Sequence, residues 1–240
     1  MNRVVTLALA LALVVPASAQ KAPTADQIVD RSVQVMGGAA WDKLQSFVAT
    51  GTISLPAQSI KGTVTMTAKA PNKLAVKQVI DSAGETLSGY DGSVGWSKDA
   101  FQGLRTLSGV ELAQLKSQAT QALRPGLWRQ LYSKTELQGT VKVGGSPAYK
   151  VKMTPKQGDP ETQYFDVKSG LPVRTDQVIV SPQGKIAVES YPSDYRTVRG
   201  VKIPYKLRQV VGPTEALLQI SEIKANAPVE DSVFAQPKAK

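Results

Sequence analysis

Apolar and polar residues alternate through residues 47–68, and this period of two restricts the fold more than any other feature. The polar positions are mainly threonine, serine and lysine. Successive side chains of a β-strand point to opposite faces, so the pattern predicts strands with one apolar and one water-facing side, as in antiparallel sheets. The apolar or small positions are Phe47, Ala49, Gly51, Ile53, Leu55, Ile60, Gly62, Val64, Met66 and Ala68.

The strand pattern continues along most of the chain. Leu74, Val76 and Ile80 extend the apolar face, and Asp91-Gly92 predicts a hairpin that ends at Trp96. Beyond residue 132, turns that contain glycine separate segments of roughly 8 to 12 residues, which is typical of all-β folds. These turns are Gly144-Gly145, Ser169-Gly170, Gln183-Gly184, Arg199-Gly200 and Gly212-Pro213. We therefore predict about eleven strands and no internal domain boundary.

Two regions have helical spacing instead. Residues 24–36 begin with Thr-x-x-Gln, a capping-box pattern, and precede the helix-ending pair Gly37-Gly38. Residues 108–132 begin with Ser-x-x-Glu and are interrupted by Pro125. We expect one helix in the first region, and a helix followed by a short second piece in the other.

The predicted fold is mainly β, with a single highly curved antiparallel sheet. Strand twist accumulates in a sheet of this size, so we predict an unclosed half-barrel with helices covering its concave face. Helices that only partly fill the half-barrel leave an apolar cavity, where ligands bind in such architectures. The alternative is that helices and side chains fill the interior completely. The residues predicted to face the cavity are Phe47, Ile53, Val64, Met66, Leu74, Val76 and Trp96 on the strands, and Leu112, Leu115 and Leu123 on the helical region.

The chain contains neither histidine nor cysteine. Without imidazole and thiolate there is no Ser-His-Asp triad, no zinc site built on those ligands and no general base with a pKa near neutrality. We therefore expect a binding protein rather than an enzyme, with no catalytic residue, metal or cofactor. The lack of cysteine also removes the thiol on which a bacterial lipoprotein is acylated, so we expect no lipid anchor.

Residues 1–19 have the pattern of a secretory signal peptide. Arg3 supplies the positive charge, Val4 to Val15 form an apolar run, and Ala17-Ser18-Ala19 offers a cleavage site. The run is too short to span a bilayer core of about 30 Å. We expect export to the periplasm and one lipid-binding domain over residues 20–240.

The formal net charge of +10 raises the question of an anionic partner. The lysines are spread singly along the predicted strands, without the interleaved aromatic residues that bind single-stranded nucleic acid. This distribution favours solvated outer faces of strands over a nucleic-acid site. We expect no nucleic-acid partner.

Several short motifs follow one another along the chain. They are Lys69-Ala70-Pro71-Asn72-Lys73-Leu74, Tyr90-Asp91-Gly92-Ser93-Val94-Gly95-Trp96, Tyr164-Phe165-Asp166 with Ser169-Gly170-Leu171-Pro172-Val173-Arg174, Ser193-Asp194-Tyr195-Arg196 with Gly200-Val201-Lys202-Ile203-Pro204-Tyr205, and Asp231-Ser232-Val233-Phe234 with Pro237. In this order, the set resembles the LolA/LolB-like periplasmic lipoprotein-carrier family, which includes outer-membrane lipoprotein-sorting proteins. The resemblance spans nearly the whole chain after residue 19.

The resemblance implies a soluble periplasmic carrier that shelters the acyl chains of lipoproteins or other lipids. Each buried CH₂ group contributes about 0.8 kcal/mol, so a long acyl chain needs such shelter to cross water. The expected partners are these acyl chains, an inner-membrane transporter that loads the carrier and an outer-membrane acceptor. The carrier itself is expected to be a monomer.

Two other interpretations stay open. The same fold serves as a regulatory sensor of mislocalised lipoproteins, although such sensors usually carry a further C-terminal domain, and we expect the carrier instead. A cofactor-free enzyme acting on an apolar substrate would rely on Tyr or Glu as a weak acid or base.

One position departs from the family pattern. Carriers of the family often have a basic residue before the Pro-Asn pair, which holds the lid closed, and here the position is Ala70. Lys69 and Lys73, the nearest basic residues, are expected to face other ways. We therefore expect the lid to be held differently in this chain.

Overall fold

The computed structural model describes residues 22–81, 83–182 and 184–238. The predicted signal peptide lies outside these residues. Within the same ranges, none of the helices is long and apolar enough to cross a membrane.

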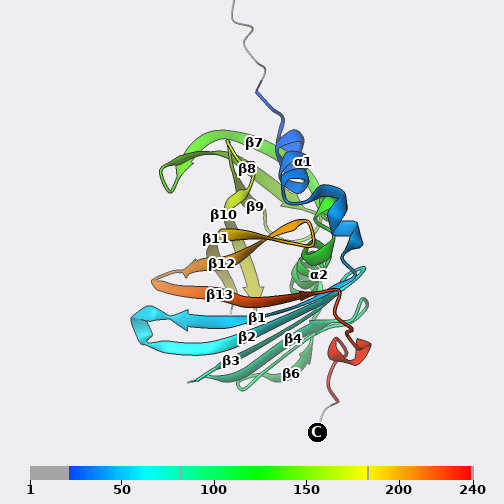
Figure 1. Ribbon diagram of the computed structural model, residues 1–240. Coiled ribbons are helices and arrows are strands. Elements are labelled where there is room, and N and C mark those ends of the chain that lie inside the picture. Colours follow the sequence, from blue (N-terminus) through cyan, green and yellow to red (C-terminus); the bar gives the residue numbers. More distant parts are fainter. Residues whose placement is uncertain (1–21, 82, 183, 239–240) are drawn as a thin grey trace, which may run out of the picture.

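The described residues form one antiparallel sheet of 13 strands. The strands are β1 (Ser46–Leu55), β2 (Ile60–Lys69), β3 (Lys73–Ile80), β4 (Gly84–Tyr90), β5 (Gly95–Asp99), β6 (Gly103–Thr106), β7 (Tyr132–Val143), β8 (Ser146–Pro155), β9 (Glu161–Asp166), β10 (Pro172–Ser181), β11 (Gly184–Val198), β12 (Val201–Val211) and β13 (Thr214–Ala225). Their order across the sheet is β6-β5-β4-β3-β2-β1-β13-β12-β11-β10-β9-β8-β7. The sheet stays open, and β6 and β7 are its two edges (Figure 1).

The predicted mainly β, unclosed antiparallel sheet is confirmed, but it has 13 strands rather than about eleven. Strands β5 and β6 have only 5 and 4 residues. Alternation over so few residues is too brief to identify a strand. Strands β1 and β13 pair directly, with Phe47 opposite Ala225. The first and the last strand along the chain therefore lie side by side near the centre of the sheet.

The helices lie on the concave side of the sheet (Figure 1). They are α1 (Ala25–Val35), α2 (Gly109–Leu123) and α3 (Trp128–Leu131). The chain also forms four short 3₁₀ helices within the described residues: η1 (Gly38–Lys43) before β1, η2 (Pro56–Gln58) between β1 and β2, η3 (Pro125–Leu127) between α2 and α3, and η4 (Asp231–Val233) in the C-terminal segment after β13. The segment that holds α2, η3 and α3 follows β6 and precedes β7, so it connects the two edges of the open sheet. Because of this topology, α2 crosses the interior of the half-barrel.

Two glycines allow the strands near the centre of the sheet to approach closely. A Cβ on Gly51 would lie 2.2 Å from the carbonyl oxygen of Gln219, and one on Gly62 would lie 2.2 Å from that of Val79. Real Cβ atoms do not come so near to a backbone oxygen, so these positions require glycine. Glycine in a strand marks such close approaches and sharp bends, which a strongly curved sheet needs.

Helix α1 begins with the predicted capping box. The hydroxyl of Thr24 accepts a hydrogen bond from the Gln27 amide, and the Gln27 side chain accepts one from the Thr24 amide. The apolar face of the helix packs on β8 and β9. The apolar cluster at this contact contains Ala25, Ile28, Val29, Trp128, Tyr132, Val151, Met153 and Phe165.

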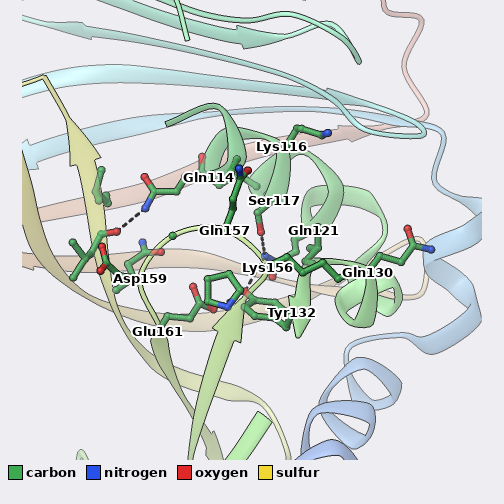
Figure 2. Close-up of a pocket in the computed structure, with 18 residues that line it drawn as sticks. Gln114, Lys116, Ser117, Gln121, Gln130, Tyr132, Lys156, Gln157, Asp159 and Glu161 are labelled. Carbon is green, nitrogen blue, oxygen red and sulfur yellow. Dashed lines mark hydrogen bonds between the residues drawn. The ribbon is translucent and has the colours of Figure 1, made fainter. Parts of the chain in front are cut away.

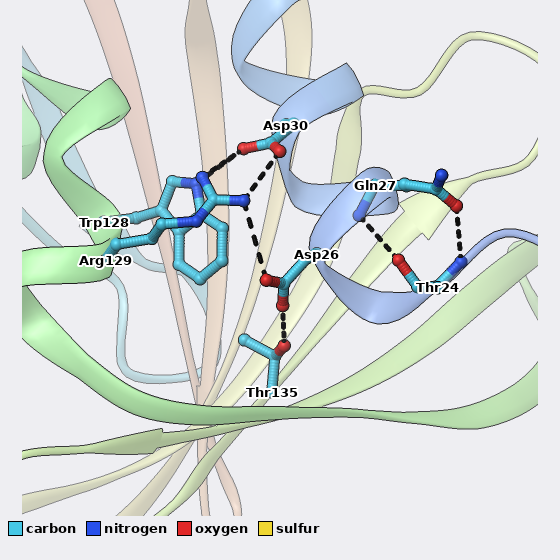
Figure 3. A network of polar contacts seen from close by, with 7 residues as sticks. All are labelled: Thr24, Asp26, Gln27, Asp30, Trp128, Arg129 and Thr135. Atoms are coloured by element: carbon cyan, nitrogen blue, oxygen red, sulfur yellow. Dashed lines mark hydrogen bonds and ion pairs between the residues drawn. The ribbon is translucent and has the colours of Figure 1, made fainter.

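A polar network fastens α1 to α3 and β7 (Figure 3). The guanidinium of Arg129 donates to both carboxylate oxygens of Asp30, at 2.6 and 2.8 Å, and the indole of Trp128 also donates to Asp30. Asp26 lies 3.6 Å from Arg129 and accepts a hydrogen bond from Thr135. The guanidinium holds the pKa of the Asp30 carboxyl below its ordinary value.

Helix α2 begins without the predicted capping box. The side chain of Ser108 makes no capping hydrogen bond. The Glu111 carboxylate instead accepts two hydrogen bonds from the guanidinium of Arg105 on β6, at 3.0 and 2.8 Å. This bidentate, charge-assisted pair is stronger than the hydrogen bond that Glu111 would accept from the backbone amide of Ser108 in a capping box. The Glu111 side chain therefore turns towards Arg105 on the sheet.

Candidate functional site on the concave face

An apolar cluster lies between α2 and strands β1 to β5. We call its residues the α2 cluster: Trp41, Leu44, Phe47, Ala49, Ala68, Leu74, Tyr90, Leu107, Leu115, Ala119, Leu123 and Val201. Of the residues predicted to line a cavity, Phe47, Leu74, Leu115 and Leu123 belong to the cluster, and Met66, Val76 and Leu112 pack against it. The structure thus brings seven of the ten predicted residues together at one place.

The α2 cluster is densely packed. Ala68, Ala119 and Leu123 expose none of their surface. Beneath α2, the arrangement therefore follows the alternative interpretation, in which helix and side chains fill the interior. An acyl chain would have to separate α2 from the sheet in order to occupy this space.

Ile53 and Val64 are also buried, but outside the α2 cluster. Ile53 pairs with Gly62 on one side and with Leu218 on the other, and Leu218 in turn pairs with Leu207. Directly paired residues share a face of the sheet. The apolar lining therefore continues along the concave face towards β12.

The orientation predicted for Trp96 is wrong. Trp96 pairs with Gly89, whereas its neighbour Gly95 faces Leu112 and Leu115 on α2. Since successive residues of a strand point to opposite faces, Trp96 lies on the convex side. Its indole donates a 2.8 Å hydrogen bond to the carbonyl of Phe234, so the C-terminal segment covers it. An apolar residue is buried on this outer face because the chain returns over it.

The residues around Ala70 do not hold the lid. Ala70 packs against the α2 cluster. Lys69 and Lys73 are directly paired, and both ammonium groups lie 2.8 Å from the carboxylate of Asp231, in the C-terminal segment. These two hydrogen-bonded ion pairs lower the pKa of Asp231 to about 2. The two lysines therefore fasten the C-terminal segment.

Two other side chains connect α2 to the rest of the molecule. The amide of Gln114 donates to the Val178 carbonyl at 2.6 Å and accepts from the Val180 amide at 3.1 Å. Both backbone groups belong to the part of β10 that extends beyond its pairing with β9. At the other end of the helix, Arg124 donates to the carbonyls of Trp41 and Leu44, at 2.9 Å each. Helical periodicity does not reveal such side-chain-to-backbone contacts, and the sequence reasoning missed both residues.

A cavity of about 240 Å³ lies between α2, β10 and the segment that joins β8 to β9 (Figure 2). Glu161 forms part of its wall, and one carboxylate oxygen accepts hydrogen bonds from Tyr132 and Gln163, both at 2.6 Å. Burial raises the pKa of the Glu161 carboxyl, and it also raises the pKa of Tyr132. We call this space the polar chamber. Nothing in the alternation of β9 distinguishes Glu161 from a surface residue, so the sequence did not indicate the chamber.

Comparison with known proteins rests on structure alone. No family model matches the chain, and no curated protein matches its sequence.

The solved structures that share the fold include the following three. A DUF1329 family protein from Desulfovibrio piger has 14% identity and a TM-score of 0.59, covering 88% of this chain and 97% of its own. A LolA superfamily protein from Nitrosomonas europaea has 12% identity and a TM-score of 0.59, covering 89% and 98%. An outer-membrane lipoprotein-sorting protein domain from Vibrio parahaemolyticus has 10% identity and a TM-score of 0.53, covering 86% and 97%. The chain therefore has the LolA-like fold that the resemblance implied.

Proposed function

We propose that the protein is a periplasmic carrier that shelters the acyl chains of lipoproteins or other lipids, for outer-membrane lipoprotein sorting. The observation that carries the proposal is the apolar concave face beneath α2, where seven of the ten predicted residues meet. The fold shared with a lipoprotein-sorting domain and a LolA superfamily protein supports it. The proposal assigns the protein no catalytic step.

Helix α2 is the element that admits a ligand in this proposal. Its apolar contacts are non-directional, and two side chains supply the directional contacts to β10 and to the segment before β1. Acyl chains make apolar contacts of the same kind, so they can replace α2 on the sheet without leaving a void. Met66 adds a flexible side chain that adapts to chains of different shape.

The proposal also covers the route of the protein. Export follows from the signal-peptide pattern of residues 1–19, and N-terminal sequencing of the secreted protein should find Gln20 first. An inner-membrane transporter would load the carrier and an outer-membrane acceptor would unload it. A protein that retains Met1 after fractionation would contradict the periplasmic location.

Binding of a fluorescent fatty acid to the purified protein tests the carrier function. A carboxylate at Met66 would be buried without a partner and would cost several kcal/mol, so Met66→Glu should abolish binding. Thr65→Glu, one residue away and on the opposite face, should leave binding intact. Circular dichroism checks that both variants fold, and Met66→Gln replaces the first variant if it does not.

Two results would contradict the proposal. A folded wild-type protein that binds neither the fatty acid nor a phospholipid is not a carrier of acyl chains. An equal loss of binding in Met66→Glu and Thr65→Glu would show that the ligand does not occupy the concave face.

A further inference from the structure

The polar chamber has polar side chains set in a partly apolar wall, unlike the apolar α2 cluster beside it. Its wall combines Tyr132, Glu161 and Ser117 with glutamines from α2, α3, β10 and the segment between β8 and β9 (Figure 2). The six glutamines are Gln114, Gln118, Gln121, Gln130, Gln157 and Gln177. A cavity of about 240 Å³ has room for roughly eight water molecules, and therefore for one small headgroup.

Several of these amides have free hydrogen-bonding capacity. Among the described residues, Gln118, Gln130, Gln157 and Gln177 form no side-chain hydrogen bond within the protein. The first three are exposed at the mouth of the chamber, and Gln177 is half-buried. Gln121 donates to Ser117 at 2.9 Å and, more weakly, to Tyr132 at 3.4 Å. Each primary amide offers two donors and an acceptor. An anion uses only donors and a cation uses only acceptors, whereas a hydroxyl group uses both.

The charges around the chamber do not favour an ionic ligand. Glu161 forms no ion pair with any described residue, and burial raises its pKa. Lys116 and Lys156 are exposed at the rim, and Asp159 is paired with Lys185 at 2.9 Å. The rim lysines repel a cation, and the Glu161 side chain offers nothing to an anion unless it is protonated.

The chamber also adjoins the apolar lining of the half-barrel. Ile179 in its wall pairs with Ile186, and Gln177 pairs with Val188 on β11. Gln114 separates the chamber from the α2 cluster, since it lies on α2 and bonds to β10. A ligand with a polar head and an apolar chain could therefore have its head in the chamber and its chain beneath α2.

We propose that the polar chamber binds a neutral, hydroxyl-rich group such as a sugar. This group can come from the headgroup of a glycolipid or from a free saccharide. The glycolipid source rests on the proposed carrier function, whose cargo would then include glycosylated lipids. The donor and acceptor pairs of the glutamines would bind the hydroxyl groups, and Tyr132 and Glu161 would bind the hydroxyl that enters deepest.

Calorimetric titration with three single-chain amphiphiles below their micelle concentrations tests the proposal. Octyl glucoside, octyltrimethylammonium and octyl sulfate share one chain and differ in headgroup. Wild-type protein should prefer the glucoside. Gln121→Leu and Gln177→Leu should each weaken glucoside binding about tenfold, because each removes one or two hydrogen bonds. Gln219→Leu, an exposed glutamine on β13, is the matched control and should change nothing.

Glu161→Gln distinguishes a hydroxyl ligand from a cation. The neutral amide still accepts a hydrogen bond from a hydroxyl, but a weaker one than a carboxylate, so glucoside binding should weaken and persist. A cation that bound through the Glu161 carboxylate would instead lose its binding altogether. If free glucose displaces octyl glucoside from the wild-type protein, the chamber binds a free saccharide. If octyl glucoside binds with the expected preference and glucose does not displace it, the ligand is the headgroup of a glycolipid. Equal binding of the three amphiphiles, or a preference for the ammonium or sulfate, would overturn the proposal and leave the carrier function standing. If none of the three amphiphiles binds while the fluorescent fatty acid does, the chamber proposal fails and the carrier function stands.

Discussion

The two helix-covered halves of the concave face are held together in different ways. Over β8 and β9, α1 has a complete capping box and an ion-pair network to α3 through Asp30 and Arg129. Over β2 to β5, α2 has no side-chain cap; Glu111 bonds to Arg105 on β6, Arg124 bonds to the carbonyls of Trp41 and Leu44, and Gln114 supplies the hydrogen bonds to β10. In the proposed carrier, the α1 half is the fixed base and the α2 half is the cover that a ligand displaces.

This difference also separates two chemical environments. The α1 half is a core of aromatic and aliphatic residues and the α2 half contains the α2 cluster, while the polar chamber lies where the two halves meet, with Tyr132 belonging to both the α1 core and the chamber wall. Protein regions of low local stability are the ones from which ligand-binding lids are drawn. The comparison predicts that a perturbation of the α1 half affects global stability and that a perturbation of α2 acts locally.

The largest effect is expected in the α1 half. Phe165 is 2% exposed and packs beneath α1. Phe165→Ala should lower the free energy of unfolding by about 3–5 kcal/mol, because it removes a buried ring and leaves a cavity. Urea unfolding measures the change. A loss below about 1 kcal/mol would show that this half is not a close-packed base.

A smaller effect is expected where α2 meets β10. Gln114→Leu leaves the Val178 carbonyl and the Val180 amide without their partner, which costs about 1–3 kcal/mol. Hydrogen exchange should become faster in α2 and stay unchanged in α1. Gln118→Leu, on the same helix, should leave exchange as in the wild type. Faster exchange in both helices would contradict the independence of the two halves.

Glu161 in the chamber should make the protein less stable as the pH rises. The pKa of Glu161 is raised in the folded protein, so the folded state binds more protons than the unfolded state above the ordinary value of 4.5. Stability should therefore fall as the pH rises from this value through the raised pKa. In Glu161→Gln this fall should disappear from urea unfolding curves. An unchanged pH profile would show that Glu161 is solvated.

In the α1 network, Asp30 should make the protein less stable as the pH falls, and this is the smallest of the four expected effects. The pKa of Asp30 is lowered in the folded protein, so its contribution is complete above the ordinary value of 3.8 and is lost as the pH falls through the lowered value. Asp30→Asn should remove this acid sensitivity. The pair is largely exposed, so salt should weaken it as well. Acid titration of the circular dichroism signal compares the variant with the wild type.

The architecture was predictable from the sequence because it depends on local patterns. Alternation identifies the long strands, and the Thr24 capping box marks the start of α1. The face of Trp96 was not predictable, since it depends on the return of Phe234 over the convex side, 138 residues later. Burial on an outer face looks the same in the sequence as burial in the core.

The candidate site was only half predictable for a related reason. Buried apolar residues recur with the period of their strand or helix, and this periodicity predicted residues of the α2 cluster. Gln114 bonds to a backbone 64 residues away and Arg124 to one 83 residues away, and backbone groups have no sequence signature. Glu161 can be recognised as a chamber residue only once the fold has brought α2 and β10 beside it.

The open sheet has a consequence for how the protein behaves in a crowded compartment. Unpaired edge strands are templates for aggregation with other chains, and native proteins prevent such pairing with short edge strands, bulges and lysines. Edge β6 has only 4 residues. Edge β7 is longer, but its pairing shifts between Leu137 and Thr140, and it carries Lys134 and Lys142. The half-barrel can thus stay open without offering a straight, unpaired edge to a neighbouring strand.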